Sequence, residues 1–262
     1  MEQVFILKVG GNIIDDEQQL AAFLQAFAEI PGKKILIHGG GKLATRMAAQ
    51  LQIPQQMVGG RRITDAETLK TVTMVYAGYI NKNIVAQLQS FQCNAIGLTG
   101  ADGNLIQAHQ RIHPTIDYGF VGDVDGINTA LLQQLLNNNS SVVVAPITHN
   151  GNGHLLNTNA DTIAQEIATA LAPHYAVSLI YLFEKAGVLM DVNDDTSVVP
   201  IITPQIYAQL KAQGIIADGM LPKLENAFTA LQKGVQRVII GKANVLSELL
   251  KGTSGTTLTS GT

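Results

Sequence analysis

The sequence contains only one cysteine, Cys93, among its 262 residues. A single cysteine excludes a disulfide within the chain and a metal centre built from several thiolates. The six histidines show no metal-ligand spacing either, so no metal-ligating residues are predicted. This use of cysteine fits a reducing compartment, and we expect a cytoplasmic protein.

Charged residues are also scarce. Asp, Glu, Lys and Arg make up 14% of the chain, against roughly 25% in an average soluble domain. The formal net charge is -3, which argues against a broad basic surface for nucleic acid. Chemistry on a small molecule is therefore the better expectation, and no nucleic-acid partner is predicted.

Long hydrophobic runs are missing as well. No apolar stretch approaches the roughly 18 to 20 residues that span a bilayer, and no basic amphipathic helix suggests attachment to a membrane surface. The first residues, MEQVFILKVGG, have an acidic second position and no basic leader, unlike a signal peptide. We therefore expect a soluble protein without a membrane partner.

The sequence does contain an alternation of short apolar runs and helical stripes. Six runs lack the polar alternation of half-exposed strands, which predicts strands covered on both faces. These runs are Val4 to Val9, Ile35 to His38, Ala95 to Leu98, Val142 to Ala145, Leu179 to Phe183 and Val238 to Ile240. Between them lie four stripes with helical spacing. The stripes are Leu20 to Ile30, capped by Asp15 or Asp16 and stopped at Pro31, then Leu43-Met47-Leu51, Ile163-Ile167-Leu171 and Leu224-Phe228-Leu231.

This alternation predicts an α/β fold, with a mainly parallel central sheet sandwiched between helices in three layers. In such a sheet the ligand site lies beyond the carboxyl ends of the strands. The polar middle, residues 99–126, is the exception. Its Asp102-Gly103 and Gly122-Asp123 pairs predict turns of a hairpin at the sheet edge. Pro173 either marks a boundary between two lobes that share the sheet or simply terminates a helix.

Two glycine-rich turns each follow a predicted strand, Gly10-Gly11 after VFILKV and Gly39 to Gly41 after KILIH. Glycines let backbone N–H groups approach an anion, and the helix after Gly41 directs the positive end of its dipole to the same place. The turns therefore indicate a phosphate site, although such turns are common in parallel sheets. Neither matches a Walker A loop or GxGxxG. The HGGG run also occurs in some esterases, but no GxSxG accompanies it, which excludes that class.

Two lysines occupy unusual positions. Lys8 interrupts a strand whose two faces are apolar, so its ammonium either extends past the strand end or serves a bound anion. Lys223 follows Pro222, which favours the first turn of a helix. The helix dipole disfavours a cation there by roughly 0.3 to 1 kcal/mol, a penalty that a bound polyphosphate would reverse. The alternative for Lys223 is an ordinary solvated lysine.

Other polar side chains are further candidates. Asp161, Asn157 and Asn159 cluster in LLNTNAD before a helical stripe, where they are either ordinary caps or part of a site. Arg62 is expected in a loop, within GGRRITD. A guanidinium there either holds a carboxylate through two parallel hydrogen bonds or is solvated.

Six motifs form an ordered set that spans nearly the whole chain: VFILKVGG, IHGGGK, GGRRITD, GLTGADG, LLNTNAD and IIADGMLPK. Each motif is weak alone, but the ordered set resembles the amino-acid kinase family. NTNAD and DGMLPK are similar to the branch that phosphorylates N-acetyl-L-glutamate, rather than to the kinases of nucleotides or carbamate. The resemblance implies the amino-acid kinase fold and an enzyme that transfers a phosphoryl group from ATP to a carboxylate.

The resemblance also implies roles for particular residues. Lys8 and Lys223 would neutralise charge on the transferred phosphoryl group, and Asp161 would hold both lysines in place. Mg2+ would bridge the phosphates, and the product would be an acyl phosphate formed without a covalent enzyme nucleophile. Substrate-binding residues are implied at Gly40, Gly41, Arg62 and Asn157. Nucleotide-binding residues are implied at Gly10, Gly11, Glu184, Lys185 and Gly187.

By the same resemblance, residues 1–176 would form a lobe that binds the acylated amino acid and dimerises, and residues 177–262 would bind the nucleotide. The implied substrate is N-acetyl-L-glutamate or N-succinyl-L-glutamate, in arginine biosynthesis. Relatives that arginine inhibits carry an extra helix before the first strand, whereas this chain enters the strand by Val4. We therefore expect insensitivity to arginine and a homodimer.

The sequence departs from the family pattern at two places. Relatives read Thr or Ser, then Asp, Val, a variable residue and Gly, where this chain has Phe183 to Gly187. Because the resemblance implies that this segment binds the nucleotide, the difference would change the contacts with it. Arg61 stands where relatives commonly place an apolar residue, and its charge would favour an acyl group with its own carboxylate, such as succinyl.

Two alternatives to this function stay open. One is a related kinase that acts on another carboxylate, such as free glutamate or an aminoadipate derivative. The other is a catalytically silent ligand-binding protein of the same fold, which the altered segment after Leu182 suggests. The presence of Lys8, Lys223 and Asp161 argues against the silent protein.

Overall fold

The computed structural model describes residues 1–58, 61–216 and 220–261. Two motif segments lie outside the described residues, Gly59-Gly60 of GGRRITD and Ala217 to Gly219 of IIADGMLPK. Within the described ranges no helix has both the length and the apolar character that crossing a membrane requires.

A sheet of eight strands runs through the molecule. Its strands are β1 (Gln3–Val9), β2 (Lys33–His38), β5 (Ala95–Leu98), β8 (Ser141–Val144), β11 (Ala176–Phe183), β12 (Ile201–Ile202), β13 (Arg237–Lys242) and β14 (Thr256–Leu258). They lie in the order β12-β14-β13-β11-β1-β2-β8-β5. Neighbours pair in parallel except β13 and β14. All six predicted strands are therefore confirmed, in a mainly parallel sheet.

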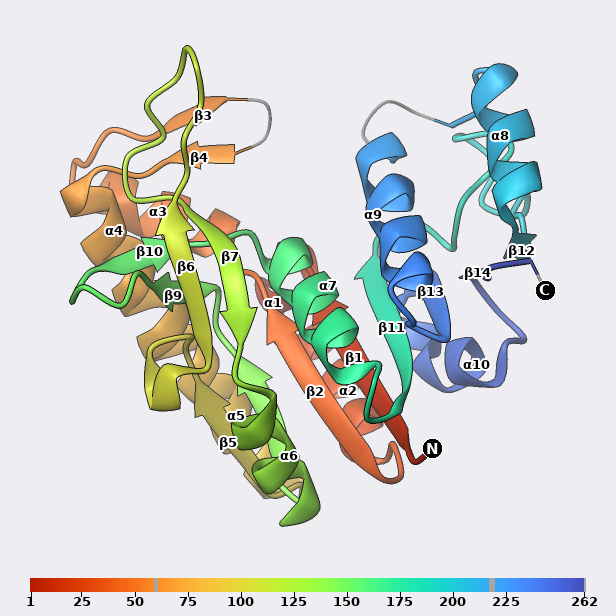
Figure 1. Cartoon of the computed structure of the whole chain (residues 1–262), viewed down its shortest axis with the longest axis horizontal. Coiled ribbons are helices and arrows are strands. Elements are labelled where there is room, and N and C mark those ends of the chain that lie inside the picture. Colours follow the sequence, from red (N-terminus) through yellow and green to blue (C-terminus); the bar gives the residue numbers. More distant parts are fainter. Residues whose placement is uncertain (59–60, 217–219, 262) are drawn as a thin grey trace.

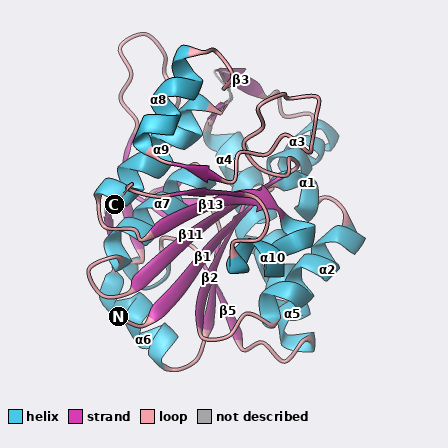
Figure 2. Cartoon of the chain, turned by 90° about the vertical axis from the view of Figure 1, so that its right-hand side faces the viewer, coloured by secondary structure: helices cyan, strands magenta, loops and turns pink. Residues whose placement is uncertain are grey.

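Helices cover both faces of this sheet, which gives the predicted three layers (Figure 1, Figure 2). One face packs against α6 (Thr129–Asn137), α7 (Ala160–Leu171), α8 (Pro204–Ala212) and α9 (Leu221–Gln232). The other packs against α1 (Gly11–Ile14), α2 (Glu17–Ala28), α3 (Gly41–Gln50), α4 (Ala66–Thr73), the π-helix η1 (Met74–Ile80), α5 (Asn81–Ser90) and α10 (Leu246–Lys251). Two short 3-10 helices are η2 (Asp102–Asn104) and η3 (Ala243–Val245).

The alternation of side chains along β1 decides where Lys8 points. Val4 and Ile6 belong to the core beneath α7 and α9, whereas Leu7 and Val9 belong to the core on the opposite face. Successive side chains of a strand alternate between faces, so Lys8 follows Val4 and Ile6 to the α7 and α9 side. This direction brings Lys8 to the helix ends described below.

The predicted helices are present, but one buried face was predicted wrongly. Asp16 caps α2, because its carboxylate accepts hydrogen bonds from the backbone N–H groups at positions 18 and 19. In α3 the buried residues are Ala44 and Ala48, whereas Met47 and Leu51 are 37% and 50% exposed. The small alanine side chains let α3 lie close to its neighbours. The prediction used the spacing of large apolar side chains, and it therefore chose the wrong face of this helix.

The polar middle of the chain does form a hairpin, but in a separate sheet. Strands β6 (Ile106–Gln110) and β7 (Gly122–Ile127) pair antiparallel and join β9 (Ile147–His149) and β10 (Leu155–Asn157) in the order β10-β9-β6-β7. Gly122 and Asp123 begin β7 instead of forming the predicted turn, and the loop between the two strands spans residues 111–121. The predicted position at the edge of the main sheet is therefore wrong.

A second small hairpin lies beside this loop. It consists of β3 (Gln56–Val58) and β4 (Arg61–Ile63), which pair antiparallel. Thr64, directly after β4, exchanges backbone hydrogen bonds with Tyr118 and Phe120, at 3.0 Å and 2.7 Å. The two hairpins thus form one wall beyond the carboxyl ends of the main strands (Figure 1).

Candidate functional site

The two glycine-rich turns lie side by side at the carboxyl ends of β1 and β2. The backbone N–H of Gly39 donates to the carbonyl of Val9 at 3.1 Å, which joins the turns. Gly10 precedes α1 and Gly40 precedes α3. Backbone N–H groups and the positive end of the α3 dipole are therefore directed beyond the sheet, as an anion site requires.

Gly40 cannot carry a side chain in this turn. Its φ is +146°, and a Cβ there would lie 2.2 Å from Cδ1 of Ile80. Ile80 ends the π-helix η1, a rare type of helix that is frequently found at functional sites. The turn is therefore packed against η1 and has little freedom to move.

Lys8 meets Asp161 at the amino end of α7. Lys8 is 9% exposed, and its Nζ lies 2.8 Å from Oδ1 of Asp161. The two groups form an ion pair, but they are not aligned for a hydrogen bond. None of the described residues donates a hydrogen bond to Asp161 Oδ1. Asn159, not Asp161, caps α7, by accepting from the N–H groups of Asp161 and Thr162. The Asp161 carboxylate is thus available to Lys8. Asp161 was expected to hold both lysines, but among the described residues it forms an ion pair with Lys8 and not with Lys223.

Lys223 lies in the first turn of α9, as predicted. Its Nζ sits 3.8 Å from the ring centroid of Phe183, and Lys8 Nζ sits 5.7 Å from the same centroid. The pKa of Lys223 is lowered overall, mainly because the ammonium is partly buried. The Asp161 carboxylate opposes this shift, and the Lys8 cation adds to it. Two lysines, one carboxylate and the amino ends of two helices therefore converge on one point.

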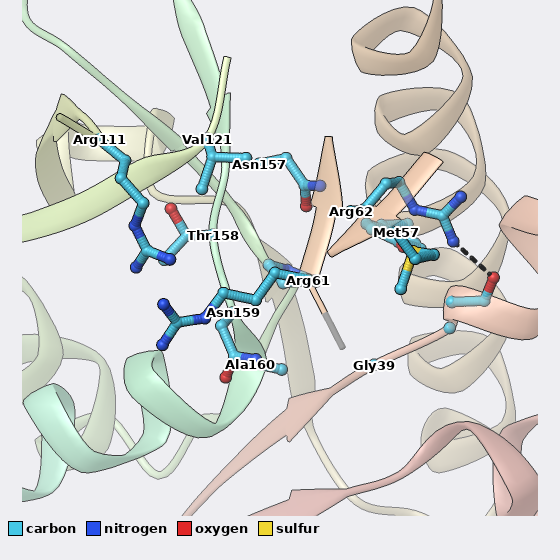
Figure 3. A pocket seen from close by; sticks show the side chains of 14 residues that line it. Gly39, Met57, Arg61, Arg62, Arg111, Val121, Asn157, Thr158, Asn159 and Ala160 are labelled. Carbon is cyan, nitrogen blue, oxygen red and sulfur yellow. Dashed lines mark hydrogen bonds between the residues drawn. The ribbon is translucent and has the colours of Figure 1, made fainter. Parts of the chain in front are cut away.

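A cavity of about 200 Å³ lies beside this point (Figure 3). Its walls come from the turn of residues 39–41, from Arg61 and Arg62 of β4, and from residues 157–160 before and within α7. Of the predicted substrate-binding residues, Gly40, Gly41, Arg62 and Asn157 all line it.

Arg62 lies in strand β4, so its predicted place in a loop is wrong. The side chain is 9% exposed and donates to the carbonyl of Gly41 at 3.0 Å, to Thr45 Oγ1 at 2.9 Å and to the amide oxygen of Gln55. Figure 3 shows it extending toward the glycine turn. These bonds fix the guanidinium at the cavity wall.

The residues of this cavity that were not predicted from the sequence include two with titratable side chains, Tyr76 and Arg111. Tyr76, in η1, is buried, and burial raises its pKa while the nearby Arg62 cation lowers it. Arg111, in the loop after β6, forms a two-pronged ion pair with Asp123. Neither residue belongs to a local motif, and only the fold brings them to residues 39–41.

A second cavity, of about 490 Å³, opens between the glycine turns and the ends of β11 and α9. All five predicted nucleotide-binding residues line it, together with Lys223 and the apolar side chains of Leu182, Met220 and Ile240. The predicted residues are Gly10, Gly11, Glu184, Lys185 and Gly187. Lys42 and Asn12, which are hydrogen-bonded to each other, line it as well and were not predicted.

The two cavities meet at Gly41, which lines both. Lys8 and Asp161 line neither cavity. A Cβ on Gly10 would lie 4.0 Å from Lys8 Nζ, so Lys8 is directly beside the turn of Gly10 and Gly11. A polar, cation-rich junction between two cavities suits the transfer of an anionic group from one bound molecule to another.

The sequence profile described as the Amino acid kinase family matches residues 3–242. The chain belongs to this family. It is 56% identical over 247 residues to the acetylglutamate kinase of Phocaeicola vulgatus, covering 94% of this chain and 96% of that protein. It is 55% identical over 251 residues to the acetylglutamate kinase of Cytophaga hutchinsonii, covering 95% of each. Among solved structures, smu.665 from Streptococcus mutans UA159 superposes with a TM-score of 0.77 at 26% identity, covering 98% of each chain.

In this amino acid kinase a buried histidine supports the glycine turn. His38 is fully buried, and its Nδ1 lies 2.8 Å from the carbonyl of Gly39. Its Nε2 lies 3.2 Å from the amide nitrogen of Asn81, which also donates to the carbonyl of Val143 at 3.1 Å. A neutral ring that donates from Nδ1 and accepts at Nε2 satisfies every one of these contacts.

The pKa of His38 is lowered to about 4, mainly because the ring is buried. The hydrogen bond to the Gly39 carbonyl opposes this shift, and the Lys82 cation adds to it. The unfolded chain therefore takes up a proton near the ordinary value of 6.5, whereas the folded chain does not until about pH 4. The contribution of His38 to the free energy of unfolding is therefore fully present above its unfolded pKa and is lost as the pH falls toward 4.

We predict that urea unfolding shows His38 contributing about 2 kcal/mol less to the free energy of unfolding at about pH 5 than at about pH 7.

The control is His38→Gln, whose side chain cannot titrate. Its unfolding free energy should be lower than wild type at neutral pH but should fall less steeply toward pH 5. Parallel pH profiles for the two proteins would contradict a neutral His38.

Proposed function

We propose that this protein is an ATP-dependent kinase that phosphorylates the side-chain carboxylate of N-acetyl-L-glutamate, a reaction of arginine biosynthesis. The observation that carries the proposal is the junction of two cavities at Gly41, with Lys8, Lys223 and Asp161 beside it. The acetylglutamate kinases that are 55% and 56% identical over nearly the whole chain support this substrate. The proposed location is the cytoplasm.

The larger cavity is the proposed nucleotide site. Its three lysines suit a polyphosphate, and its apolar residues suit a base. Gly10 and Gly11 would present backbone N–H groups to the phosphates. Residues 177–262 supply much of this site and residues 1–176 supply all of the smaller cavity, which agrees with the proposed division into a nucleotide lobe and a substrate lobe.

The residues present also fit the use of Mg2+. The described part of the chain contains no group of three or more His, Cys, Asp or Glu side chains that could hold a metal ion. Mg2+ is commonly held through substrate phosphates with few protein ligands. We propose that it arrives on the nucleotide, where it supplies charge neutralisation.

Phosphoryl transfer needs positioning and positive charge rather than an enzyme nucleophile. The substrate carboxylate oxygen forms the new bond to phosphorus as the bond to the ADP oxygen breaks, so an acyl phosphate and ADP leave. Lys8 and Lys223 would stabilise the negative charge on the transferred group, and Asp161 would keep Lys8 in place. Gly40 and Gly41 would hold the reacting carboxylate, while Arg62 and Asn157 would hold the rest of the acylated amino acid.

The test is to trap the acyl phosphate. Purified protein with MgATP and hydroxylamine is given N-acetyl-glutamate, N-succinyl-glutamate or free glutamate, and hydroxamate is measured together with ADP. We expect hydroxamate with an N-acylated glutamate, and a loss of kcat of about 100-fold or more in Lys8→Ala and Lys223→Ala.

The matched control is Lys70→Ala, because Lys70 pairs with Glu67 on an exposed surface. It should retain wild-type activity. Hydroxamate with free glutamate alone would assign the protein to a kinase of another carboxylate. No hydroxamate from any substrate despite ATP binding would favour the silent binding protein.

A specific observation favours N-succinyl-L-glutamate as a second candidate substrate. Arg61 and Arg111 both line the substrate cavity in addition to Arg62, and Figure 3 shows both side chains near Thr158 and Asn159. The Nη1 group of Arg111 is buried and has no hydrogen-bond partner among the described residues. An unsatisfied guanidinium N–H is costly, and a second carboxylate on the acyl group would satisfy it.

We predict that Arg61→Leu lowers kcat/KM for N-succinyl-glutamate about tenfold relative to that for N-acetyl-glutamate, because one charge-assisted contact is lost. Arg46→Leu is the control, since Arg46 is an exposed arginine that pairs with Asp15 outside this cavity. If wild type and Arg61→Leu discriminate equally between the substrates, the second candidate is wrong.

We also propose a homodimer. Four large apolar side chains at two neighbouring helices are exposed: Met47 of α3, Leu51 directly after it, and Met74 and Tyr79 of η1. Exposed apolar side chains of this kind commonly mark an interface. Light scattering should give about twice 27.9 kDa, and Met74→Glu should lower this mass, whereas Met190→Glu should not. A monomeric or hexameric wild type would contradict the proposal.

A further inference from the structure

The Phe183 ring, at the carboxyl end of β11, lies within cation–π range of two lysine ammonium groups. Lys223 Nζ lies 3.8 Å from the ring centroid and Lys8 Nζ lies 5.7 Å from it. Both distances fall within the roughly 6 Å over which the ring quadrupole attracts a cation. One aromatic side chain therefore joins cations from β1 and from α9.

The ring itself is held in place by its neighbour on the same strand face. Tyr181 stacks on Phe183 with centroids 6.2 Å apart and planes inclined by 18°. The Tyr181 hydroxyl donates to the backbone carbonyl of Asp161 at 3.3 Å. Because Asp161 also pairs with Lys8, the ring belongs to a set of contacts that joins β11, α7 and β1.

Two lysines converge here, but only one carboxylate balances them. Lys8 pairs with Asp161, whereas no ion pair to a carboxylate involves Lys223 among the described residues. A second carboxylate would compete with an incoming phosphate for the ammonium N–H groups. An aromatic face attracts the cation without using those donors in directed hydrogen bonds.

We propose that Phe183 is a positioning residue, whose ring holds the Lys223 ammonium at the edge of the nucleotide cavity with its N–H donors free for phosphate. Both residues line that cavity. The inference rests on the proposed phosphoryl transfer for its purpose. The attraction between the ring and the cation can be measured without that reaction.

The test replaces Phe183 by mono-, di- and trifluorophenylalanine through amber suppression. Each fluorine weakens the negative ring face with little change of shape, so a cation contact weakens in steps while apolar packing persists. We expect log kcat for acyl phosphate formation to fall in proportion to the number of fluorines, by about tenfold at the trifluoro ring. KM for the acylated amino acid should stay unchanged.

A matched series at Phe228 is the control, because that ring lies on α9 but packs against Tyr207. It should leave kcat unchanged. In a Lys223→Ala background the Phe183 series should be much shallower, since the nearer of the two cations is gone and only Lys8, 5.7 Å from the ring centroid, is left. A flat series at Phe183 in the wild-type background, or an equal slope without Lys223, would overturn the inference.

An independent readout separates this inference from the proposed function. NMR of methylated lysines should show the pKa of Lys223 falling with each fluorine, because the ring stabilises the charged form. If the wild type forms no acyl phosphate, the proposed function is wrong, and this titration alone decides the role of Phe183. An unchanged Lys223 pKa across the series would overturn the proposal that the Phe183 ring positions Lys223.

Discussion

The contact between Lys8 and Asp161, at 2.8 Å, is the interaction on which the candidate site depends. A lysine at 9% exposure in the central strand of an apolar sheet would be strongly destabilising without a partner. Asp161 supplies that partner from the first turn of α7, where it leaves the capping role to Asn159. The pair thereby attaches the end of β1 to α7 and places a fixed cation beside Gly10, at the point where the two cavities approach one another.

The parallel sheet explains why the other parts gather at the same point. Its central strands β1, β2 and β11 all run in the same direction, so their following turns emerge at one edge. Side-chain alternation then sends Lys8 and Phe183 toward the face that carries α7 and α9. The amino ends of these helices bring Asp161 and Lys223. The glycine turn is held separately, by His38 below it and by Ile80 of the π-helix against Gly40.

The sequence was sufficient to predict six of the eight strands of the main sheet, since each of these runs is continuous and apolar, although β5 at the edge of the sheet leaves Ile96 37% exposed. It was also sufficient to place Lys223 in the first turn of a helix, because Pro222 restricts the backbone locally. It failed where the outcome depends on distant segments. Whether Met47 or Ala48 of α3 faces inward depends on what packs against that helix. Arg111 reaches the cavity lined by Arg62 only because the loop between β6 and β7 packs against Thr64 and Asn157, and no local pattern carries that information.

The most direct test of the central claim is a crystal structure with MgADP, aluminium fluoride and N-acetyl-L-glutamate. The aluminium fluoride group imitates the phosphoryl group during its transfer. It should lie at the junction beside Gly41, within hydrogen-bond distance of the Nζ atoms of both Lys8 and Lys223, with Asp161 still paired to Lys8. A fluoride group bound away from both lysines, or an acylated amino acid outside the cavity lined by Arg62, would contradict the claim that these residues form the site of phosphoryl transfer.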